Sequence, residues 1–424
     1  MQISIFDGVK PFKITKPIRL ITLFSGYDSQ ALSLKYLGIP FEHYHTCEWA
    51  IPSIQALKDL HFGYDNGDYS VCLSKADLVD ILYAKGVSSD YNKPLTKEQL
   101  NRYPEKKLRT IYNNIIATKN LVSICNINGK DLEICDTDKY EYIMTYSFPC
   151  QDLSTAGKGA GMEKGSGTRS SLLWEVERLL KETKELPQVL LMENVPEVIG
   201  SKNIKHFAKW LEKLESLGYN NKWQRLNAKD FEIPQNRERC FMVSVLGDYF
   251  YNFSSPIGCE LKLKDVVMYN PQYKLKLDKL NNIEKNAIRK IASSTIAKTV
   301  RTSGRGSIDR HSWDIYGANF GDSEAFILDP LKETSRAIRA SQAKGGYTDF
   351  EEYFYYSPLE CFRLMAVKDK DFEKIAKNQS KSSLYHLAGD SIVTTVLMAI
   401  FGQMFDIDWE TKINELAEEL TNER

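Results

Sequence analysis

The sequence has no net charge to indicate a partner, because 56 Lys and Arg residues balance 56 Asp and Glu residues. Any contact with a polyanion must therefore be regional. The eight cysteines include no CxxC pair and no regular spacing, which argues against a disulfide framework and favours reduced thiols in a cytoplasm. No segment approaches about eighteen uninterrupted apolar residues, and the first residues lack the apolar stretch of a signal peptide. We expect a soluble cytoplasmic protein with no membrane partner.

Internal repeats and low-complexity tracts are also absent, and 42% hydrophobic content in 424 residues is enough for a large core and two or three domains. From Ile18 onward, short apolar runs alternate with amphipathic stretches. This rhythm predicts an α/β fold with a mostly parallel sheet. The predicted strands cover residues 19–24, 41–48, 142–148, 188–193 and 239–245, and the clearest predicted helix covers residues 171–182.

Two stretches depart from this rhythm. Residues 61–120 are polar and rich in Tyr and Lys, and we interpret them as a mainly helical insertion. Residues 256–350 lose the alternation, and positions 271–310 hold ten Lys and Arg against three Asp and Glu, a local net charge of +7. We predict a first domain over residues 17–255, a separate basic module over 256–350, and a return to the first domain over 351–424, with an apolar helix from about 392 to 404.

Ligands of open α/β sheets bind beyond the carboxyl ends of the strands, so residues there are the candidates for chemistry. Phe24 ends the first strand and, with Ser25 and Gly26, leads into a small-residue turn, which is either a cofactor site at a helix N-terminus or an ordinary connection. Glu48 ends the second strand, where it either accepts hydrogen bonds from ribose hydroxyls or is a solvated loop carboxylate. Trp49 either stacks on adenine or belongs to the core.

Cys150 follows a buried strand and Pro149, and a Gly-rich stretch comes after it. Most cytosolic cysteines are inert small hydrophobic residues, but a thiol at a strand end is placed to act as a nucleophile. Glu193 ends the next predicted strand, and Arg237 and Arg239 enter a further one. Each charged residue alone is best explained by a surface ion pair.

Together, these three strand ends fit chemistry at carbon 5 of a cytosine. That carbon is a poor nucleophile until a thiolate adds to carbon 6 and turns the ring into an enamine that attacks an electrophilic methyl group. A carboxylic acid near N3 and a guanidinium near O2 would stabilise the charge that the addition places on the ring. Cys150, Glu193 and one of the two arginines supply these groups.

The ordered motifs resemble those of the DNA cytosine-5 methyltransferase family over most of the chain. Pro149, Cys150 and Gln151 form PCQ, Glu193 to Val195 form ENV, and residues 235–239 form QxRxR. Near the C-terminus, the segment around Glu360 and Arg363 is similar to the family's structural Glu–Arg motif, and LAGDSIVTTVL is similar to its last, cofactor-facing motif.

The resemblance implies a Rossmann-like methyltransferase that uses S-adenosyl-L-methionine, with the basic module as a smaller target recognition domain. It assigns catalysis to Cys150, Glu193, Arg237 and Arg239. The implied cofactor contacts are Phe24, Ser25, Gly26, Glu48, Trp49, Pro149, Asp390, Ser391 and Ile392. The implied DNA contacts are Gln151, Ser154, Gln235, Arg301, Arg305 and Arg310.

The implied partner is double-stranded DNA from which the target cytosine is flipped out. We expect a monomer in a bacterial or phage-infected cell, and the resemblance allows for a cognate restriction endonuclease that acts separately. Arg301, Arg305 and Arg310 lie among glycines and a serine, a composition that fits either a loop meeting phosphates and guanine edges or a plain basic surface loop.

Two departures from the family pattern concern the cofactor. Tyr27, Asp28 and Ser29 follow FSG where further glycines are usual, so the backbone of that turn must differ. Asp390 stands where the last motif usually has Asn, and a carboxylate cannot donate a hydrogen bond. Because of the insertion, the sequence does not identify the residues that contact adenine. Asn126, Ile127 and Asp131 are candidates for these contacts.

Two rival hypotheses remain. An RNA-directed branch of the same family uses the same motifs, but the basic module of about ninety residues favours duplex DNA. The second rival is a non-catalytic DNA-binding relative with a decayed cofactor pocket, against which Cys150, Glu193 and Arg239 argue because all three are present.

Overall fold

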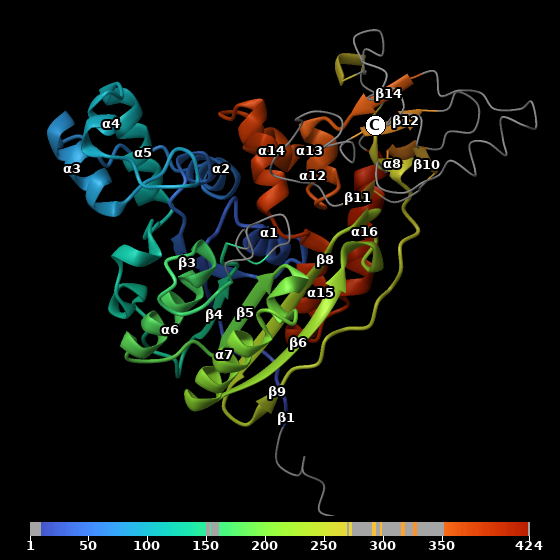
Figure 1. Ribbon diagram of the computed structural model, residues 1–424, viewed down its shortest axis with the longest axis horizontal. Coiled ribbons are helices and arrows are strands. Elements are labelled where there is room, and N and C mark those ends of the chain that lie inside the picture. Colours follow the sequence, from blue (N-terminus) through green and yellow to red (C-terminus); the bar gives the residue numbers. More distant parts are fainter. Residues whose placement is uncertain are drawn as a thin grey trace, which may run out of the picture. The chain divides into compact units, whose positions relative to one another are not determined.

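The computed structural model describes residues 10–149, 153, 161–268, 271–273, 291–293, 297–298, 315–318, 325–328 and 352–422. The chain divides into two compact units. Unit 1 holds residues 1–226, 238–255 and 397–409, and unit 2 holds residues 227–237, 256–396 and 410–424. Figure 1 shows the elements of both units coloured along the sequence.

Unit 1 is built on a six-stranded sheet with the order β3-β2-β4-β5-β8-β6. Strands β2, β3, β4 and β5 run parallel, and β8 is antiparallel to β5. The α/β class with a mostly parallel sheet is therefore confirmed, and the five predicted strands lie within two residues of the observed ones. The strands are β2 (Ile18–Leu23), β3 (Phe41–Cys47), β4 (Glu141–Tyr146), β5 (Val189–Asn194), β6 (Tyr219–Asn227) and β8 (Glu238–Leu246).

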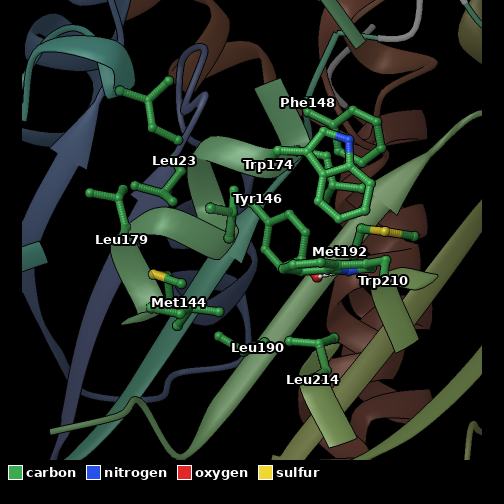
Figure 2. Packing of buried hydrophobic residues seen from close by; sticks show 14 of the residues in the cluster. Leu23, Met144, Tyr146, Phe148, Trp174, Leu179, Leu190, Met192, Trp210 and Leu214 are labelled. Carbon is green, nitrogen blue, oxygen red and sulfur yellow. Dashed lines mark hydrogen bonds between the residues drawn. The ribbon is translucent and has the colours of Figure 1, made fainter. Parts of the chain in front are cut away.

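The central strands are buried on both faces, as parallel strands covered by helices must be. Every residue of β4 and β5 is buried. Figure 2 shows Met144, Tyr146, Leu190 and Met192 of these strands among apolar side chains of the helices, Trp174 included. The helices around this sheet are α1 (Ser29–Tyr36), α2 (Ile51–His61), α6 (Leu173–Glu182), α7 (Ile204–Ser216) and, in its last part, α15 (Thr394–Phe405).

The predicted helix over residues 171–182 is observed as a short 3-10 turn, η3 (Arg169–Leu172), followed by α6. Leu173, Val176, Leu179 and Leu180 of α6 are buried, because they recur at the spacing that keeps one helical face toward the sheet. The chain that leads into α6 is therefore fixed to the core.

Three helices occupy the segment between His61 and Asn120: α3 (Lys75–Lys85), α4 (Lys97–Asn101) and α5 (Glu105–Ala117). They lie side by side in Figure 1 and share a small core of their own with α2. Ser74 and Thr96 precede α3 and α4 as capping boxes, in which the side chain of each of two residues accepts a hydrogen bond from the backbone amide of the other.

Unit 2 contains a four-stranded antiparallel sheet with the order β10-β13-β12-β14, which comprises β10 (Ile291–Ser293), β12 (Ile315–Ala318), β13 (Ala325–Leu328) and β14 (Glu352–Tyr355). Its helices are α8 (Leu263–Val266), α12 (Pro358–Arg363), α13 (Asp369–Ala376), α14 (Lys381–Asp390) and most of α16 (Trp409–Asn422). The predicted return to the first domain at residue 351 differs from this division, in which residues 256–396 stay together.

The run from Lys381 to Phe405 is long and apolar enough to cross a membrane by length and composition alone. Within it, 78% of the most apolar window is buried inside the structure, as in the core helix of a soluble protein. The apolar helix predicted from about 392 to 404 corresponds to α15.

Candidate active site

One edge of the unit 1 sheet collects several of the predicted site residues. The carboxyl ends of β2, β3, β4 and β5 meet there because these strands are parallel. Strand β8 runs the other way, with Asn194 opposite Cys240, so the beginning of β8 lies at the same edge. The topology thus brings the turn after β2, Glu48, Pro149, Glu193 and Arg239 to one side of the sheet.

The turn after β2 has a backbone that explains how the chain manages with few glycines. Phe24, Gly26 and Asp28 all have positive φ, at 58°, 58° and 63°. Asp28 tolerates this conformation because its carboxylate caps α1, accepting from the amide of Ala31 at 3.0 Å and from the hydroxyl of Thr22 at 3.2 Å. The sequence predicts that the backbone of this turn differs from the family pattern. The structure shows an aspartate, Asp28, in a positive-φ conformation that usually favours glycine.

Ser25 is buried, and its hydroxyl donates to the carbonyl of Thr22 at 2.6 Å. Phe24 is partly buried against the main core, and its amide donates to the carbonyl of Cys47. The amide of Gly26 donates to Glu48 at 2.9 Å. The Ser25 hydroxyl and the backbone amides of Phe24 and Gly26 thus hold the turn in place beside Cys47 and Glu48.

Glu48 is 7% exposed and both of its carboxylate oxygens accept backbone amides, from Gly26 at 2.9 Å and from Ala50 at 2.7 Å. A carboxylate oxygen has a second lone pair, so each can still accept a hydroxyl hydrogen. Asn120 braces this residue, because its side chain bonds both the amide and the carbonyl of Glu48. The sequence offered no signal for Asn120. Trp49 is partly buried and packs against the core of the helical insertion.

The strand β4 leads to Phe148 and Pro149, and Cys150 itself lies outside the described residues. Asn194, in the ENV motif, donates from its side-chain amide to the carbonyl of Phe148 at 2.9 Å. Asn194 is 2% exposed. The end of β5 therefore holds the backbone two residues before Cys150.

Glu193 and Arg239 form an ion pair across β5 and β8. The Nε of Arg239 lies 3.1 Å from Oε1 of Glu193, and the two side chains are 16% and 10% exposed. Arg239 also donates to the carbonyl of Glu238. A carboxylate and a guanidinium that were predicted from separate motifs are thus in contact at the sheet edge.

Among the described cysteines, Cys240 lies nearest to this pair along the chain, and it is fully buried. Burial, with the charge of Glu193 next in importance, raises the pKa of its thiol to about 12. Burial also raises the pKa of the Cys47 thiol. Since the thiolate is the nucleophilic form, neither residue can compete at neutral pH with a thiol in an ordinary environment.

Gln235 and Arg237 belong to unit 2 and are 0% and 3% exposed. Gln235 donates from its side-chain amide to the carbonyl of Leu364. Nη2 of Arg237 donates to the carbonyls of Gly389 and Ser391 at 2.8 and 2.7 Å. The side chain of Gln235 is thus fully buried, and its predicted contact with DNA stays a prediction, while Arg237 holds the backbone of the last motif.

In that last motif, Ile392 is buried and the Ser391 hydroxyl donates to the carbonyl of Ala388 at 3.0 Å. The side chain of Asp390 is 53% exposed, and its carboxylate lies 3.3 Å from Nδ1 of His386 one helical turn earlier. The Asp390 carboxylate, which stands where the family usually has the side-chain amide of Asn, therefore lies beside the imidazole of His386.

The predicted structural residues Glu360 and Arg363 are both fully buried. Nε of Arg363 donates to Asp369 at 2.8 Å, and Glu360 accepts from the amides of Ser357 and Met268. The Arg363 guanidinium is thus paired with a carboxylate, and the Glu360 carboxylate with two backbone amides. The amide of Ser357 ties Glu360 to the beginning of α12.

Of the adenine-side candidates, Asn126 donates to the carbonyl of Ala84, Asp131 accepts from the amide of Asn128, and Ile127 is buried. No group of three or more His, Cys, Asp or Glu side chains that could hold a metal occurs in the part of the chain that the structure describes.

Cys150 is one of six predicted site residues that lie outside the described residues, together with Gln151, Ser154, Arg301, Arg305 and Arg310. Within unit 2, β11 (Ala297–Lys298) pairs in parallel with β7 (Gln235–Asn236). The chain that leads to Arg301 is therefore joined to the QxRxR motif.

Comparisons with known proteins agree with this arrangement. A family model described as C-5 cytosine-specific DNA methylase matches residues 97–406. The type II methyltransferase M2.ScrFI of Lactococcus lactis subsp. cremoris is 31% identical over 392 residues, which are 92% of this chain and 99% of that protein. The orphan methyltransferase M.SssI of Spiroplasma monobiae is 30% identical over 400 residues, which are 92% and 98% of the two chains.

Among solved structures, the methyltransferase EhMeth of Entamoeba histolytica aligns with a TM-score of 0.58 at 14% identity, over 92% of this chain and 99% of that one. Dnmt2 of S. pombe aligns with a TM-score of 0.56 at 15% identity, over 92% and 98%. At such low identities these two structures establish the shared fold.

Proposed function

Because the chain belongs to the family of C-5 cytosine-specific DNA methylases, we propose that it transfers a methyl group from S-adenosyl-L-methionine to carbon 5 of a flipped-out cytosine in duplex DNA. The observation that carries this proposal is the Glu193–Arg239 ion pair, at the sheet edge where β4 delivers the chain to Cys150. A base placed at this edge would meet a carboxyl group and a guanidinium held in fixed relation.

The proposed reaction begins when the thiolate of Cys150 adds to carbon 6, forming a carbon–sulfur bond while N3 gains a proton. Carbon 5 of the resulting enamine would then take the methyl group from S-adenosyl-L-methionine, and the electron pair of the broken carbon–sulfur bond would stay on the cofactor's sulfur. Transfer of the carbon 5 proton to solvent then expels the thiolate from carbon 6, and N3 gives up the proton it had gained, which restores the aromatic cytosine. Thiol addition is needed because the unactivated ring carbon is too weak a nucleophile.

Glu193 engages N3 and the exocyclic amino group, and Arg239 contacts O2. These assignments follow from charge, since addition of the thiolate moves electron density toward N3 and O2. The ion pair keeps both side chains in place before a base arrives, so little reorganisation is needed during the reaction. Arg237 acts at a distance in this account, through the carbonyls of Gly389 and Ser391.

S-adenosyl-L-methionine supplies the electrophilic methyl group. The residues at the sheet edge fit such a ligand, because a carboxylate such as that of Glu48 is an acceptor suited to ribose hydroxyls and a Cβ built on Gly26 would meet no atom within 4 Å. Trp49 is partly buried, which leaves part of its ring for contact with adenine. By the family resemblance, Asp390, Ser391 and Ile392 of the last motif are our further candidates for cofactor contacts.

Double-stranded DNA is the proposed substrate, and the basic stretch over residues 271–310 is the proposed recognition surface. The target base must leave the stack because a thiolate cannot reach carbon 6 within the duplex. Arg301 and Arg305 follow β11 closely along the chain and are our candidates for contacts to phosphates or guanine edges.

The test of this function is methyl transfer from labelled cofactor to three substrates: unmethylated duplex DNA, the same DNA already methylated at cytosine, and transfer RNA. We expect label in unmethylated DNA alone. Label in RNA alone would favour the RNA-directed rival, and no transfer to any substrate, with DNA still bound, would favour a non-catalytic relative. Cys150→Ala should lose transfer and keep DNA binding.

A further inference from the structure

The peptide that leads into Cys150 is held by two side chains from different elements. Asn194, at the end of β5, donates to the carbonyl of Phe148. Ser170, in η3, donates from its hydroxyl to the carbonyl of Pro149 at 2.7 Å. These are successive carbonyls, so both peptide units before Cys150 have a fixed direction.

Ser170 occupies a rigid and secluded position. It is fully buried, and it lies three residues before Leu173, the first residue of a helix whose apolar face is embedded in the main core. The chain before it is also anchored, since the Trp174 indole donates to the carbonyl of Met162 at 2.8 Å and Lys164 pairs with the buried Glu177. The Ser170 hydroxyl therefore belongs to an element, η3, that is held on both sides, so it keeps its position if Pro149 moves.

We infer that Ser170 is a positioning residue for the nucleophile of the methyl-transfer reaction, an inference that rests on the proposed function. The carbonyl of Pro149 belongs to the planar peptide unit whose nitrogen is that of Cys150. A hydrogen bond to this carbonyl therefore restrains the last described residue before the nucleophile. Through this hydrogen bond, Ser170 is joined to Pro149, the residue immediately before the nucleophile.

Loss of the hydroxyl should act on chemistry more than on binding. Ser170→Ala leaves a buried carbonyl without this donor and lets the peptide rotate, and small displacements of a reacting group lower rates by about 10- to 100-fold. Ser170 contacts neither ligand in this account. A purely structural serine would change the melting temperature and leave the rate constant of the folded enzyme as it was.

The experiment measures covalent adduct formation with duplex DNA that contains 5-fluorocytosine, in single turnover with saturating DNA and cofactor. Ser171→Ala is the matched control, because the hydroxyl of this neighbouring residue donates within its own turn, to the carbonyl of Thr168 at 2.6 Å. We expect Ser170→Ala to slow adduct formation by about tenfold or more with DNA and cofactor affinities within about twofold of wild type. Ser171→Ala should match wild type.

Equal rates for Ser170→Ala and wild type would overturn the inference and leave the proposed function intact. Slowing that disappears at higher DNA or cofactor concentration would also overturn it, because the effect would then lie in binding. A wild type that forms no adduct would remove the proposed function and this inference together. Should Ser170→Ala fail to fold, Ser170→Cys is close in size and a weaker donor, and the same slowing is expected.

Discussion

The ion pair between Glu193 and Arg239 gives a prediction whose size follows from its geometry. With Nε and Oε1 3.1 Å apart, Coulomb attraction at an effective dielectric constant of about 20 amounts to roughly 5 kcal/mol. Desolvation of two side chains that are 10% and 16% exposed offsets much of this gain. We expect a net coupling free energy of about 1–3 kcal/mol in unfolding.

A double-mutant cycle with Glu193→Gln, Arg239→Met and both changes together measures this coupling by urea unfolding. The exposed pair Lys412–Glu415, with side chains 42% and 53% exposed, is the control and should show about 0.5 kcal/mol or less. The same single variants should slow methyl transfer by about 100-fold or more, because each removes a group that faces developing charge. A coupling no larger than that of the control, or single variants with wild-type rates, would refute the assignment.

Three further predictions concern other parts of the chain. Asp390→Asn should preserve or tighten cofactor binding in calorimetry, and weaker binding would show that the carboxylate facing His386 has a role of its own. Arg301→Ala and Arg305→Ala should lower DNA affinity or flatten its salt dependence, with a cost of about 1–3 kcal/mol where a guanine is read, while cofactor affinity stays unchanged. Burial lowers the pKa of His61 well below its ordinary value, so below about pH 6.5 the unfolded state binds a proton that the folded state excludes. Folding stability should therefore fall with acidity through that range, and His61→Gln should make the fall less steep.

The sheet could be predicted because its central strands are apolar on both faces. The sequence YNNKWQRLN of β6 gave no such signal, since most of its residues are at least partly exposed and polar. The left-handed backbone conformation of Asp28 could not be predicted from the sequence either. A sequence shows that glycines are missing from the turn, but only the fold shows an aspartate in the left-handed conformation with its carboxylate capping α1.

The motifs placed the chemistry but did not distinguish residues that touch a base from residues that hold the backbone. Arg237 and Arg239 are two positions apart in one motif, yet one binds carbonyls of the last motif and the other pairs with Glu193. Residues two apart in a regular strand would face the same side, but Arg237 lies between β7 and β8 and belongs to neither strand. Ser170 belongs to no motif, and its contact with Pro149 depends on tertiary structure alone.

The central claim, that Cys150 attacks carbon 6 of a cytosine, has one direct measurement. The protein is incubated with cofactor and duplex DNA containing 5-fluorocytosine, the complex is denatured and digested, and the peptide that carries the nucleotide is sequenced by mass spectrometry. Fluorine at carbon 5 prevents the elimination that would free the enzyme, so we predict a stable adduct on Cys150 that carries the transferred methyl group and is absent from Cys150→Ala. An adduct on Cys240 or another cysteine, or no adduct from a preparation that methylates ordinary DNA, would contradict the account.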